Sequence, residues 1–464
     1  MDRHTRLLTL IVLLTLSFCQ SGRESRVPQN VLLITLDTVR FDYFSYALTG
    51  APRKLRSPEM ENLVKNGTIF TQAVTSINST NPSHLSILTS QYPARLGVHS
   101  NTDRYSERYP TLAEILKQNG YHTAAAVSAF HLGNPKFDIL RGFTDRAIPQ
   151  GAFTATEMTD LAIQWLTKKQ RGKFLLWLHY FDPHAVYTPP AKYISSDDQT
   201  IPESDRQPVQ GDGVIRVLDR DLFFARSGFG SLWQNWIGTE NRLVNVKRYY
   251  MGEVLYMCSE IGRILRFLEN SADRDKTLIV IVADHGESLG EHGIYFDHTG
   301  LYEPQVRVPL VFYHASGVPA GRVVPQQVRT IDILPTVLDL LGVSKDYGFE
   351  GASLSPLLFT TIDSKHTGRT AVIENTAQTQ VCVRSERWKY ILPLKPDRIL
   401  QNQEQIFDLS RDPQESINML EQQEAIAEPF NRLLEAYLKQ SKAGEQPELS
   451  NEELDRLRSL GYVN

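Results

Sequence analysis

Cysteine is scarce in this sequence, with only three among 464 residues. Cys19 lies in an apolar stretch near the N-terminus, which leaves Cys258 and Cys382 for the rest of the chain. At most one disulfide can form between them, so a fold held together by disulfides is excluded. With 41% apolar residues, the chain is long enough to bury one large core and the core of a smaller domain.

The sequence also lacks a strong excess of either charge. Its 49 basic and 53 acidic residues give a net charge of -4. This balance argues neither for nucleic acid nor for an anionic membrane surface as a partner, and we expect no nucleic acid.

Long apolar runs are missing as well. The Leu-rich run from Leu7 to Phe18 follows Arg3 and Arg6, and it is too short to cross a bilayer as a mature helix. It predicts a signal peptide over residues 1–19 and therefore export.

The end of this signal resembles a bacterial lipobox, because Leu16-Ser-Phe-Cys19 is followed by polar residues. A lipid on Cys19 would anchor the protein to a membrane. We expect the protein in the periplasm or cell envelope, either free or as such a lipoprotein.

Three apolar runs predict buried strands, at residues 30–36, 173–180 and 277–283. Apolar spacings of three and four residues predict helices at residues 156–169, 247–269 and 332–341. Strands that alternate with helices in this way indicate an α/β fold, with a large, mixed but mostly parallel sheet flanked by helices on both faces.

Charged side chains follow these strands directly. Asp37 comes after the first run, and Asp284 and His285 come after the third. Because the carboxyl ends of parallel strands meet at one edge of a sheet, we expect the three side chains to lie together there. Two carboxylates and one imidazole are typical ligands of a single divalent cation.

A helix start supplies a fourth candidate ligand. Pro82 suits the first helical turn, and Thr80 or Asn81 is the predicted N-cap. Thr80 therefore lies at a helix N-terminus, where unpaired N–H groups and the helix dipole favour an alkoxide or the oxygens of phosphate or sulfate. We predict that the metal lowers the pKa of the Thr80 hydroxyl, which then acts as the nucleophile.

The sequence resembles the sulfatases and their relatives in the alkaline phosphatase superfamily over most of its length. The resemblance is carried by the order and spacing of several stretches, namely residues 30–40, Asn81-Pro-Ser-His84, Phe181-Asp-Pro-His184, Ala283-Asp-His-Gly286, Tyr302-Glu303 and Arg307-Val-Pro309. It implies a catalytic domain over residues 28–343 and a small C-terminal α+β subdomain over residues 344–443. Residues 444–464 would form a linker and a terminal helix.

The C-terminal part also has strand and helix signals of its own. Short β-type segments predict an antiparallel sheet at residues 371–375, 381–385, 388–392 and 405–409, and residues 421–439 are predicted to be helical around Pro429. Ser450 and Glu453 form a predicted capping box for the last helix, which ends at Gly461. An aromatic insertion at residues 194–245 either overhangs the site or packs on the surface.

Three departures from the sulfatase pattern bear on the chemistry. Sulfatases carry Cys or Ser, oxidised to formylglycine, where this chain has Thr80, and a secondary alcohol cannot give that aldehyde. An ester on Thr80 must be released by water, which favours phosphate or phosphonate esters. The Arg of the sulfatase motif is replaced by His84, and a second metal-binding Asp is replaced by Thr38.

The resemblance and the residue chemistry together give a set of candidate site residues. His184 and His298 are candidates to stabilise developing charge or to protonate the leaving group. Asp182 is a candidate to support His184 or to bind a second metal. The complete prediction is Thr80, His184 and His298 for catalysis; Arg40, His84 and His131 for substrate binding; and Asp37, Thr80, Asp284 and His285 for one divalent ion, whether Ca, Mn or Zn.

These observations predict an exported, metal-dependent hydrolase of sulfate- or phosphate-type esters, acting on a small molecule, a glycan or a lipid. Two alternatives remain open at this point. One is a transferase of the same superfamily that moves a phospho-group to an envelope acceptor, and the other is a catalytically degenerate binding protein. The sequence does not decide between sulfur and phosphorus, or the organic part of the substrate.

Overall fold

The computed structural model describes residues 27–106, 109–169, 172–194, 201–202, 243–343, 345–360, 368–397 and 400–459. The predicted signal peptide, most of the insertion at 194–245 and Gly461 lie outside these residues. Within them, no helix is apolar and long enough to cross a membrane.

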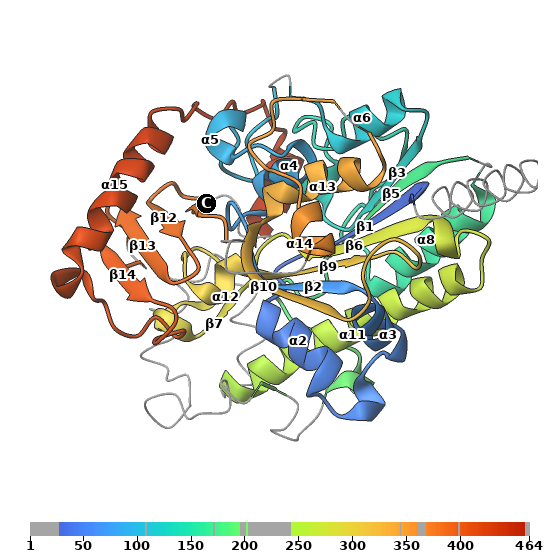
Figure 1. Ribbon diagram of the computed structural model, residues 1–464, viewed down its shortest axis with the longest axis horizontal. Coiled ribbons are helices and arrows are strands. Elements are labelled where there is room, and N and C mark those ends of the chain that lie inside the picture. The colour runs from blue at the N-terminus through green and yellow to red at the C-terminus, as the bar shows by residue number, and fades with distance from the viewer. Residues whose placement is uncertain are drawn as a thin grey trace, which may run out of the picture.

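An eight-stranded sheet forms the centre of the molecule (Figure 1). Its strand order is β10-β2-β9-β6-β1-β5-β3-β4. The strands are β1 (Asn30–Leu36), β2 (Thr68–Val74), β3 (His122–Val127), β4 (Asp145–Ala147), β5 (Phe174–Tyr180), β6 (Thr277–Ala283), β9 (Arg307–Tyr313) and β10 (Arg322–Arg329).

The three predicted strands lie side by side in the middle of this sheet. β1 pairs in parallel with β5 on one side and with β6 on the other, and Leu36 is in register with both Tyr180 and Ala283. The three strands therefore end at the same level. β9 runs antiparallel to its neighbours β2 and β6, so the predicted mixed, mostly parallel sheet is confirmed.

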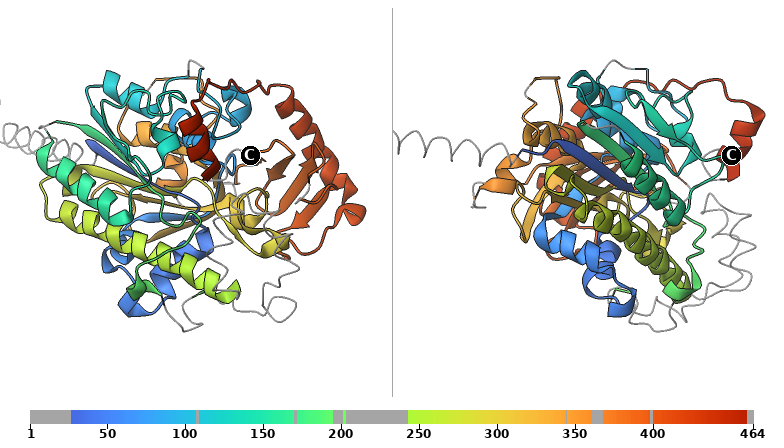
Figure 2. Two further views of the ribbon diagram at one scale, coloured as in Figure 1. Left: turned by 180° about the vertical axis from the view of Figure 1, so that it is seen from behind. Right: turned by 90° about the vertical axis from the view of Figure 1, so that its right-hand side faces the viewer.

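Helices cover both faces of the sheet (Figures 1 and 2). One group of helices packs around α11, and the other around α4. The first group is α2 (Phe41–Thr49), α3 (Pro58–Asn66), α8 (Ala155–Lys168) and α11 (Leu243–Glu269); the second is α4 (Thr80–Thr89), α6 (Leu112–Gln118), α13 (Ile333–Leu340) and α14 (Ser355–Phe359). Every residue of β1, β5 and β6 is buried, since each strand is covered on both faces.

A second, four-stranded antiparallel sheet lies beside the first, toward the C-terminal end of the chain. It consists of β11 (Ala371–Glu374), β12 (Gln380–Arg384), β13 (Trp388–Pro393) and β14 (Gln405–Asp408), and α15 (Glu424–Leu438) packs against it with Pro429 inside the helix. In α16 (Asn451–Ser459), Ser450 and Glu453 form the predicted capping box, and Leu457 is buried in the main core.

Short elements complete the described chain. They are α5 (Pro93–Leu96), α7 (Phe130–Gly133), α12 (Glu303–Val306), β7 (Ser288–Leu289), β8 (Tyr295–Asp297), and 3-10 helices at Arg53–Leu55, Ala191–Tyr193, Arg274–Lys276, Glu291–Gly293, Thr330–Asp332 and Leu420–Gln422. Cys258 and Cys382 are both buried free thiols, in α11 and β12 respectively, so the one disulfide that the sequence allowed is not formed.

A buried histidine ties the loop that follows α5 to the second sheet. His99 Nδ1 lies 2.7 Å from Glu374 Oε2 in β11, and Nε2 lies 2.9 Å from the Lys442 carbonyl oxygen. The Tyr437 hydroxyl donates to the other oxygen of Glu374. Because both ring nitrogens face acceptors, the protonated imidazole is favoured: burial opposes protonation, but the hydrogen bond and charge of Glu374 raise the pKa of His99 overall.

Loss of this contact will make the stability of the protein less dependent on pH. A raised folded-state pKa gives a contribution that is complete below the unfolded value of 6.5 and is lost as pH rises through the folded value. At pH 6, His99→Gln will lower the free energy of unfolding by about 1.5 kcal/mol, and the deficit will shrink toward pH 9. Denaturant titrations across this range measure it.

The control is His122→Gln, which removes a half-exposed contact with Asp145 at 2.8 Å. It will lower the free energy of unfolding by less than about 1 kcal/mol at pH 6. A His99→Gln deficit that stays constant from pH 6 to pH 9 would show that protonation of His99 is not the source of its stabilisation.

Candidate active site

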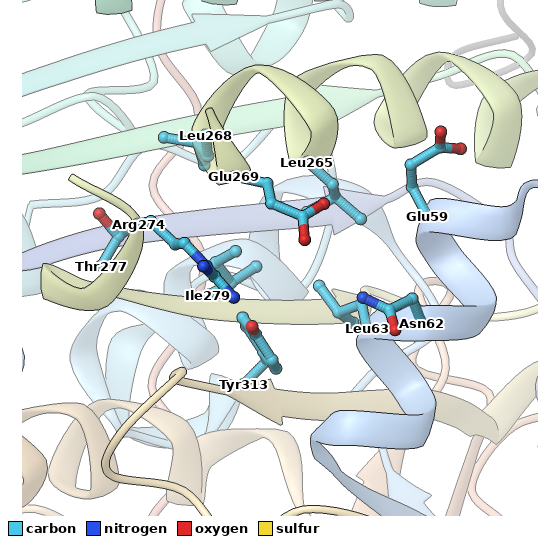
Figure 3. Close-up of a pocket in the computed structure, with 10 residues that line it drawn as sticks. All are labelled: Glu59, Asn62, Leu63, Leu265, Leu268, Glu269, Arg274, Thr277, Ile279 and Tyr313. Carbon is cyan, nitrogen blue, oxygen red and sulfur yellow. The ribbon is translucent and has the colours of Figure 1, made fainter. Parts of the chain in front are cut away.

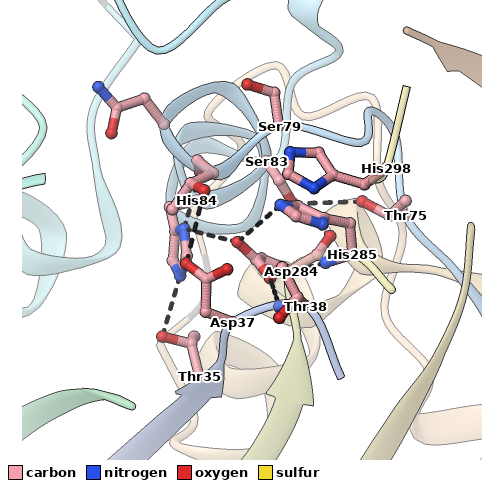
Figure 4. A network of polar contacts seen from close by, with 12 residues as sticks. Thr35, Asp37, Thr38, Thr75, Ser79, Ser83, His84, Asp284, His285 and His298 are labelled. Atoms are coloured by element: carbon pink, nitrogen blue, oxygen red, sulfur yellow. Dashed lines mark hydrogen bonds and ion pairs between the residues drawn. The ribbon is translucent and has the colours of Figure 1, made fainter. Parts of the chain in front are cut away.

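The ends of β1 and β6 bring the predicted metal ligands together. Asp37 follows β1, and Asp284 and His285 follow β6; all three side chains are fully buried. Figure 4 shows them gathered beside α4. One ligand atom from each lies within 4.8 Å of the others, so the predicted convergence on one edge of the sheet is confirmed.

Each of these three residues has one buried side-chain atom that lacks a hydrogen-bond partner. Asp37 Oδ1, Asp284 Oδ2 and His285 Nε2 are buried atoms without a hydrogen-bond partner. His285 Nδ1 lies 3.0 Å from the Gly286 carbonyl and therefore donates to it, which leaves Nε2 as the basic nitrogen. Burial and the nearby His298 lower the pKa of His285 well below its usual value, so its imidazole is neutral and able to bind a metal.

The two carboxylates repel each other in the absence of a cation. Burial raises the pKa of Asp37 to about 8. Burial and the charge of Asp37 also raise the pKa of Asp284 well above its ordinary value. A divalent cation between them would reverse both shifts, since opposite charge favours ionised carboxylates. The two carboxylate oxygens and one neutral imidazole fit such an ion.

Backbone groups fix the carboxylate of Asp284. Its Oδ1 accepts hydrogen bonds from the backbone N–H groups of His285 at 2.8 Å and Thr38 at 3.3 Å. The chain can pass this point closely only because the next residue is Gly286: a Cβ there would lie 2.0 Å from the Pro304 carbonyl oxygen. The second oxygen of Asp284 therefore keeps a fixed direction.

His179 holds the second oxygen of Asp37. Its Nδ1 accepts from the Ser128 N–H at 3.3 Å, so Nε2 carries the proton and donates to Asp37 Oδ2 at 3.1 Å. Burial keeps His179 neutral, with a pKa of about 3. Thr80 Oγ1 donates to the same oxygen at 3.5 Å. Asp37 thus receives two hydrogen bonds on Oδ2 and keeps Oδ1 for a metal.

Thr80 lies at the N-terminus of α4, as predicted, but it is the first helical residue, so the prediction of Thr80 or Asn81 as N-cap is wrong. Ser79 occupies the N-cap position, and its side chain makes no capping bond. The whole of α4 is buried, so its apolar residues do not form a single inward face. Thr80 itself lies close to Asp37 at the positive end of the helix dipole.

Thr38 has a backbone conformation that is unusual for its side chain. Its φ of 54° lies in the left-handed region, which β-branched residues rarely adopt. Its buried Oγ1 has no hydrogen-bond partner, and the Tyr250 hydroxyl donates to its carbonyl oxygen at 2.6 Å. Such strain is concentrated at functional sites. A hydroxyl thus occupies the position where the sequence suggested a missing carboxylate.

The predicted catalytic histidines lie on the other side of His285. The rings of His298 and His285 are 4.4 Å apart, and those of His298 and His184 are 6.1 Å apart. Burial opposes protonation of His298, but contact with Glu287 at 3.5 Å and the charge of Asp297 raise its pKa to about 9. Burial lowers the pKa of His184 to about 3, and its ring stacks on Phe181 at 4.4 Å. The site therefore pairs one cationic and one neutral imidazole.

His84 lies in the site, where both of its ring nitrogens bond to protein groups, and its predicted role in substrate binding stays a prediction. Its Nδ1 donates to the Thr80 carbonyl oxygen at 2.7 Å, and its Nε2 accepts from Thr35 Oγ1 at 3.0 Å. Trp177 Nε1 donates to the same threonine oxygen at 2.8 Å. His84, His179 and Asp284 form a second possible ligand group, but the nitrogens of both imidazoles already have protein partners. His84 therefore connects α4 to β1.

Arg40 and Asp182 each contact neighbouring protein groups. The guanidinium of Arg40 pairs with Asp42 at 2.8 Å and with Glu291 at 2.8 Å, and its predicted role in substrate binding stays a prediction. Asp182 Oδ1 accepts from the Ala155 N–H at 2.8 Å, at the start of α8, so it supports that helix; its predicted roles beside His184 or at a second metal stay predictions. Both residues act as local anchors beside the site.

His131 lies in α7, fully buried. Burial and the neighbouring His179 and His184 lower its pKa well below the usual value. It therefore belongs to the same group of buried imidazoles. Its predicted contact with substrate stays a prediction.

Sequence reasoning missed His179 and Glu287. His179 is a single imidazole in an otherwise apolar strand, and only its register beside Thr35 in β1 places it against Asp37. Glu287 is three residues beyond Asp284 and is fully buried. The one available signal was its position inside a polar stretch that directly follows a buried strand.

One of the described pockets lies away from the candidate site. It is lined by Glu59, Leu265, Thr277, Tyr313 and their neighbours (Figure 3). Thr277 begins β6, and Tyr313 ends the antiparallel β9. The pocket is therefore at the amino-terminal edge of the parallel strands, opposite the candidate site.

The sequence profile of the family described as Sulfatase matches residues 29–343. The chain belongs to the sulfatase family. A second profile, described as N-sulphoglucosamine sulphohydrolase, C-terminal, matches residues 290–443. The site described above lies within the first match.

Several known proteins resemble this sulfatase-family chain. It is 25% identical to a choline-sulfatase of Rhizobium meliloti, over 84% of this chain and 82% of that protein. It is 24% identical to an N-acetylglucosamine-6-O-sulfatase of Bacteroides thetaiotaomicron, over 76% and 75%. A phosphonate monoester hydrolase of Agrobacterium radiobacter matches its fold with a TM-score of 0.67 at 20% identity, over 90% of this chain and 100% of that one.

A structure solved with its substrate D-glucosamine-2-N,6-O-disulfate matches with a TM-score of 0.69 at 20% identity, covering 89% of this chain and 98% of that one. The protein is therefore an ester hydrolase of the sulfatase and alkaline phosphatase superfamily. Members of this family are metal-dependent, and the Asp37, Asp284 and His285 donor set is where such an ion fits.

Removing the two carboxylates will remove metal binding. Wild-type protein treated with a chelator and then given Mn²⁺ or Zn²⁺ will gain thermal stability, because an ion that binds only the folded state stabilises it. Asp37→Asn/Asp284→Asn will show no metal-dependent shift in melting temperature and will retain little metal by elemental analysis.

Asp182→Asn is the matched control, since it alters a buried carboxylate next to the site but outside the donor set. It will keep the metal-dependent shift. Loss of that shift in Asp182→Asn alone would instead favour the alternative in which Asp182 is a metal ligand.

Proposed function

We propose that this sulfatase-family protein is an exported, metal-dependent hydrolase of sulfate- or phosphate-type esters with Thr80 as its nucleophile. The proposal rests mainly on one contact, the 3.5 Å hydrogen bond from Thr80 Oγ1 to Asp37 Oδ2. It puts the hydroxyl beside the donor set and at a helix N-terminus, where an alkoxide is stabilised. A threonine cannot be oxidised to formylglycine, so the hydroxyl itself must attack.

Different residues of the site would take part in different steps of the reaction. Asp37, Asp284 and His285 would hold the ion, with Thr38 Oγ1 beside them. When bound, such an ion lowers the pKa of a neighbouring hydroxyl and polarises a substrate oxygen. Thr80 loses its proton toward Asp37 and attacks the sulfur or phosphorus atom, and the ester bond to the leaving alcohol breaks. Water then hydrolyses the ester on Thr80 and regenerates the hydroxyl.

His298 is placed to act on the leaving group. Its pKa of about 9 makes it a cation at neutral pH, able to stabilise the developing oxyanion or donate a proton to it. Glu287 holds this cation in place. His184, neutral and stacked on Phe181, forms the adjacent wall of the site.

The charge of the site favours substrates with a single negative charge. In the part of the chain that is described, the charged groups that shift the pKa values of Asp37, Asp284 and His298 are acidic residues and imidazoles. One divalent ion and the His298 cation balance Asp37, Asp284 and Glu287 with little charge to spare. Sulfate monoesters, phosphate diesters and phosphonate monoesters are monoanions at neutral pH, whereas phosphate monoesters are dianions.

The donor set indicates which ion would bind, and the N-terminal sequence indicates where the protein would be located. An imidazole among the ligands favours Mn or Zn over Ca. Export is supported by the Leu-rich run before Cys19. The phosphonate monoester hydrolase and the sulfatases of the same fold support an ester of sulfate or phosphonate type as the substrate.

Replacing Thr80 will abolish turnover. With the metal-loaded enzyme and aryl sulfate, phosphate diester and phosphonate monoester probes, Thr80→Ala will lose about 10³-fold or more in kcat, and Thr80→Ser will retain measurable activity because it keeps a hydroxyl. Thr89→Ala is the control, since Thr89 lies in the same helix, is buried, and bonds only the Leu85 carbonyl in the described structure. Turnover by Thr80→Ala at the wild-type rate would rule out this nucleophile.

The probe panel will also rank substrates by charge. We expect kcat/KM for an aryl phosphate monoester dianion to be at least about 10-fold below that of the best monoanionic probe with the same leaving group, because one uncompensated charge in a buried site costs about 1.4 kcal/mol or more. Steady-state kinetics at pH 8 measure it. A preference for the dianion would show that a further cationic group acts in the site.

A further inference from the structure

The N-cap residue of α4, the helix that carries Thr80, does not cap the helix with its side chain. Ser79, at its N-cap, makes no side-chain bond to the first turn, although an N-cap serine normally accepts from a backbone N–H there. The acceptor comes instead from Asn101, which lies 20 residues further along the chain from Asn81. Its side-chain Oδ1 accepts from the Asn81 backbone N–H at 2.7 Å.

Asn101 holds the residues on both sides of Thr80. Its Oδ1 also accepts from Ser79 Oγ at 3.1 Å, and its backbone carbonyl accepts from Asn81 Nδ2 at 3.0 Å. Asn101 is 3% exposed. All the hydrogen bonds that the described structure gives its side chain go to Ser79 and Asn81, one residue before and one residue after Thr80.

The loop that carries Asn101 is itself firmly anchored. Asp103 Oδ2 accepts from the backbone N–H groups of His99 at 2.8 Å and Ser100 at 2.9 Å. The Arg104 N–H donates to the Glu445 carbonyl at 2.6 Å. Asn101 is therefore a fixed acceptor, set from outside α4.

We propose that Asn101 is a positioning residue for Thr80, an inference that rests on the proposed nucleophile. By holding Ser79 and Asn81 on a single oxygen atom, Asn101 fixes the backbone of Thr80, and with it the direction of Oγ1 toward Asp37. A displacement of about 1 Å at a reacting group can cost about 100-fold in rate. Asn101 touches neither Asp37, Asp284 nor His285 in the described hydrogen bonds, so its loss should slow the reaction without removing the metal.

The experiment compares Asn101→Ala, Asn101→Asp and Thr80→Ala in the metal-loaded full chain, with the best probe of the ester panel. Thr111→Ala is the matched control. Thr111 caps α6 by accepting from the Glu114 N–H at 3.1 Å. The substitution therefore removes a cap of the same kind from a helix without catalytic residues. Hydrogen exchange of the peptide containing Asn81 provides a readout that needs no substrate.

We expect Asn101→Ala to lower kcat by about 30- to 100-fold with KM changed by less than about threefold, and to speed exchange at Asn81. Its melting temperature and bound metal will match those of Thr111→Ala. Asn101→Asp keeps an acceptor at the helix N-terminus, where Asp caps as well as Asn, and will restore kcat to within about fivefold of wild type.

The proposal is overturned if Asn101→Ala leaves kcat or Asn81 exchange unchanged, or if Thr111→Ala lowers kcat as much. It is also overturned if Asn101→Asp is no better than Asn101→Ala. If Thr80→Ala remains active, both the nucleophile and the positioning role are wrong. If Thr80→Ala is inactive while Asn101→Ala is fully active, only the positioning role is wrong.

Discussion

Two carboxylates, Asp37 and Asp284, lie side by side inside the protein, and the surrounding structure is arranged around their charge. Neighbouring parallel strands end at the same level and bring them together. His179 and backbone N–H groups occupy one oxygen of each, and the unpaired oxygens face His285 Nε2. Burying like charges so close together is costly unless a cation joins them. The proposed metal ion would therefore stabilise this arrangement.

The proposed differences from a formylglycine sulfatase form a consistent set. In this proposal Thr80 stands in place of the oxidised residue, the Thr38 hydroxyl in place of a carboxylate, and His84 in place of a guanidinium. His84 does not take over the role of a cation: it is neutral, with burial lowering its pKa well below the usual value, and it bonds to Thr80 and Thr35. The loss of one acidic and one basic group leaves the charge of the site balanced while its hydrogen bonding changes.

Much of the fold and the metal donor set could be predicted from sequence, because both follow from local patterns. Apolar runs define β1, β5 and β6, and Asp37, Asp284 and His285 come directly after two of them. The contacts of Arg40, Asp182 and Asn101 could not be predicted. Each depends on which distant backbone or carboxylate lies nearby, such as Glu291 for Arg40 or Ala155 for Asp182. His179 was missed because the spacing of apolar residues and their expected burial do not distinguish an imidazole that bonds across strands from an ordinary core residue.

The contact between His99 and the Lys442 carbonyl joins residues 343 positions apart, and it belongs to the same anchored loop as Asn101. Contacts between such distant residues form late in folding, since closing a long loop of chain costs entropy before any contact compensates for it. The carboxylate pair depends on a contact of the same kind, since Thr38 and Asp284 are 246 positions apart, whereas Asn101 is only 20 positions from Asn81. The start of α4 and its acceptor would therefore be ordered before the carboxylates meet. Metal uptake would then be the last step in assembling the site, and turnover would begin with it.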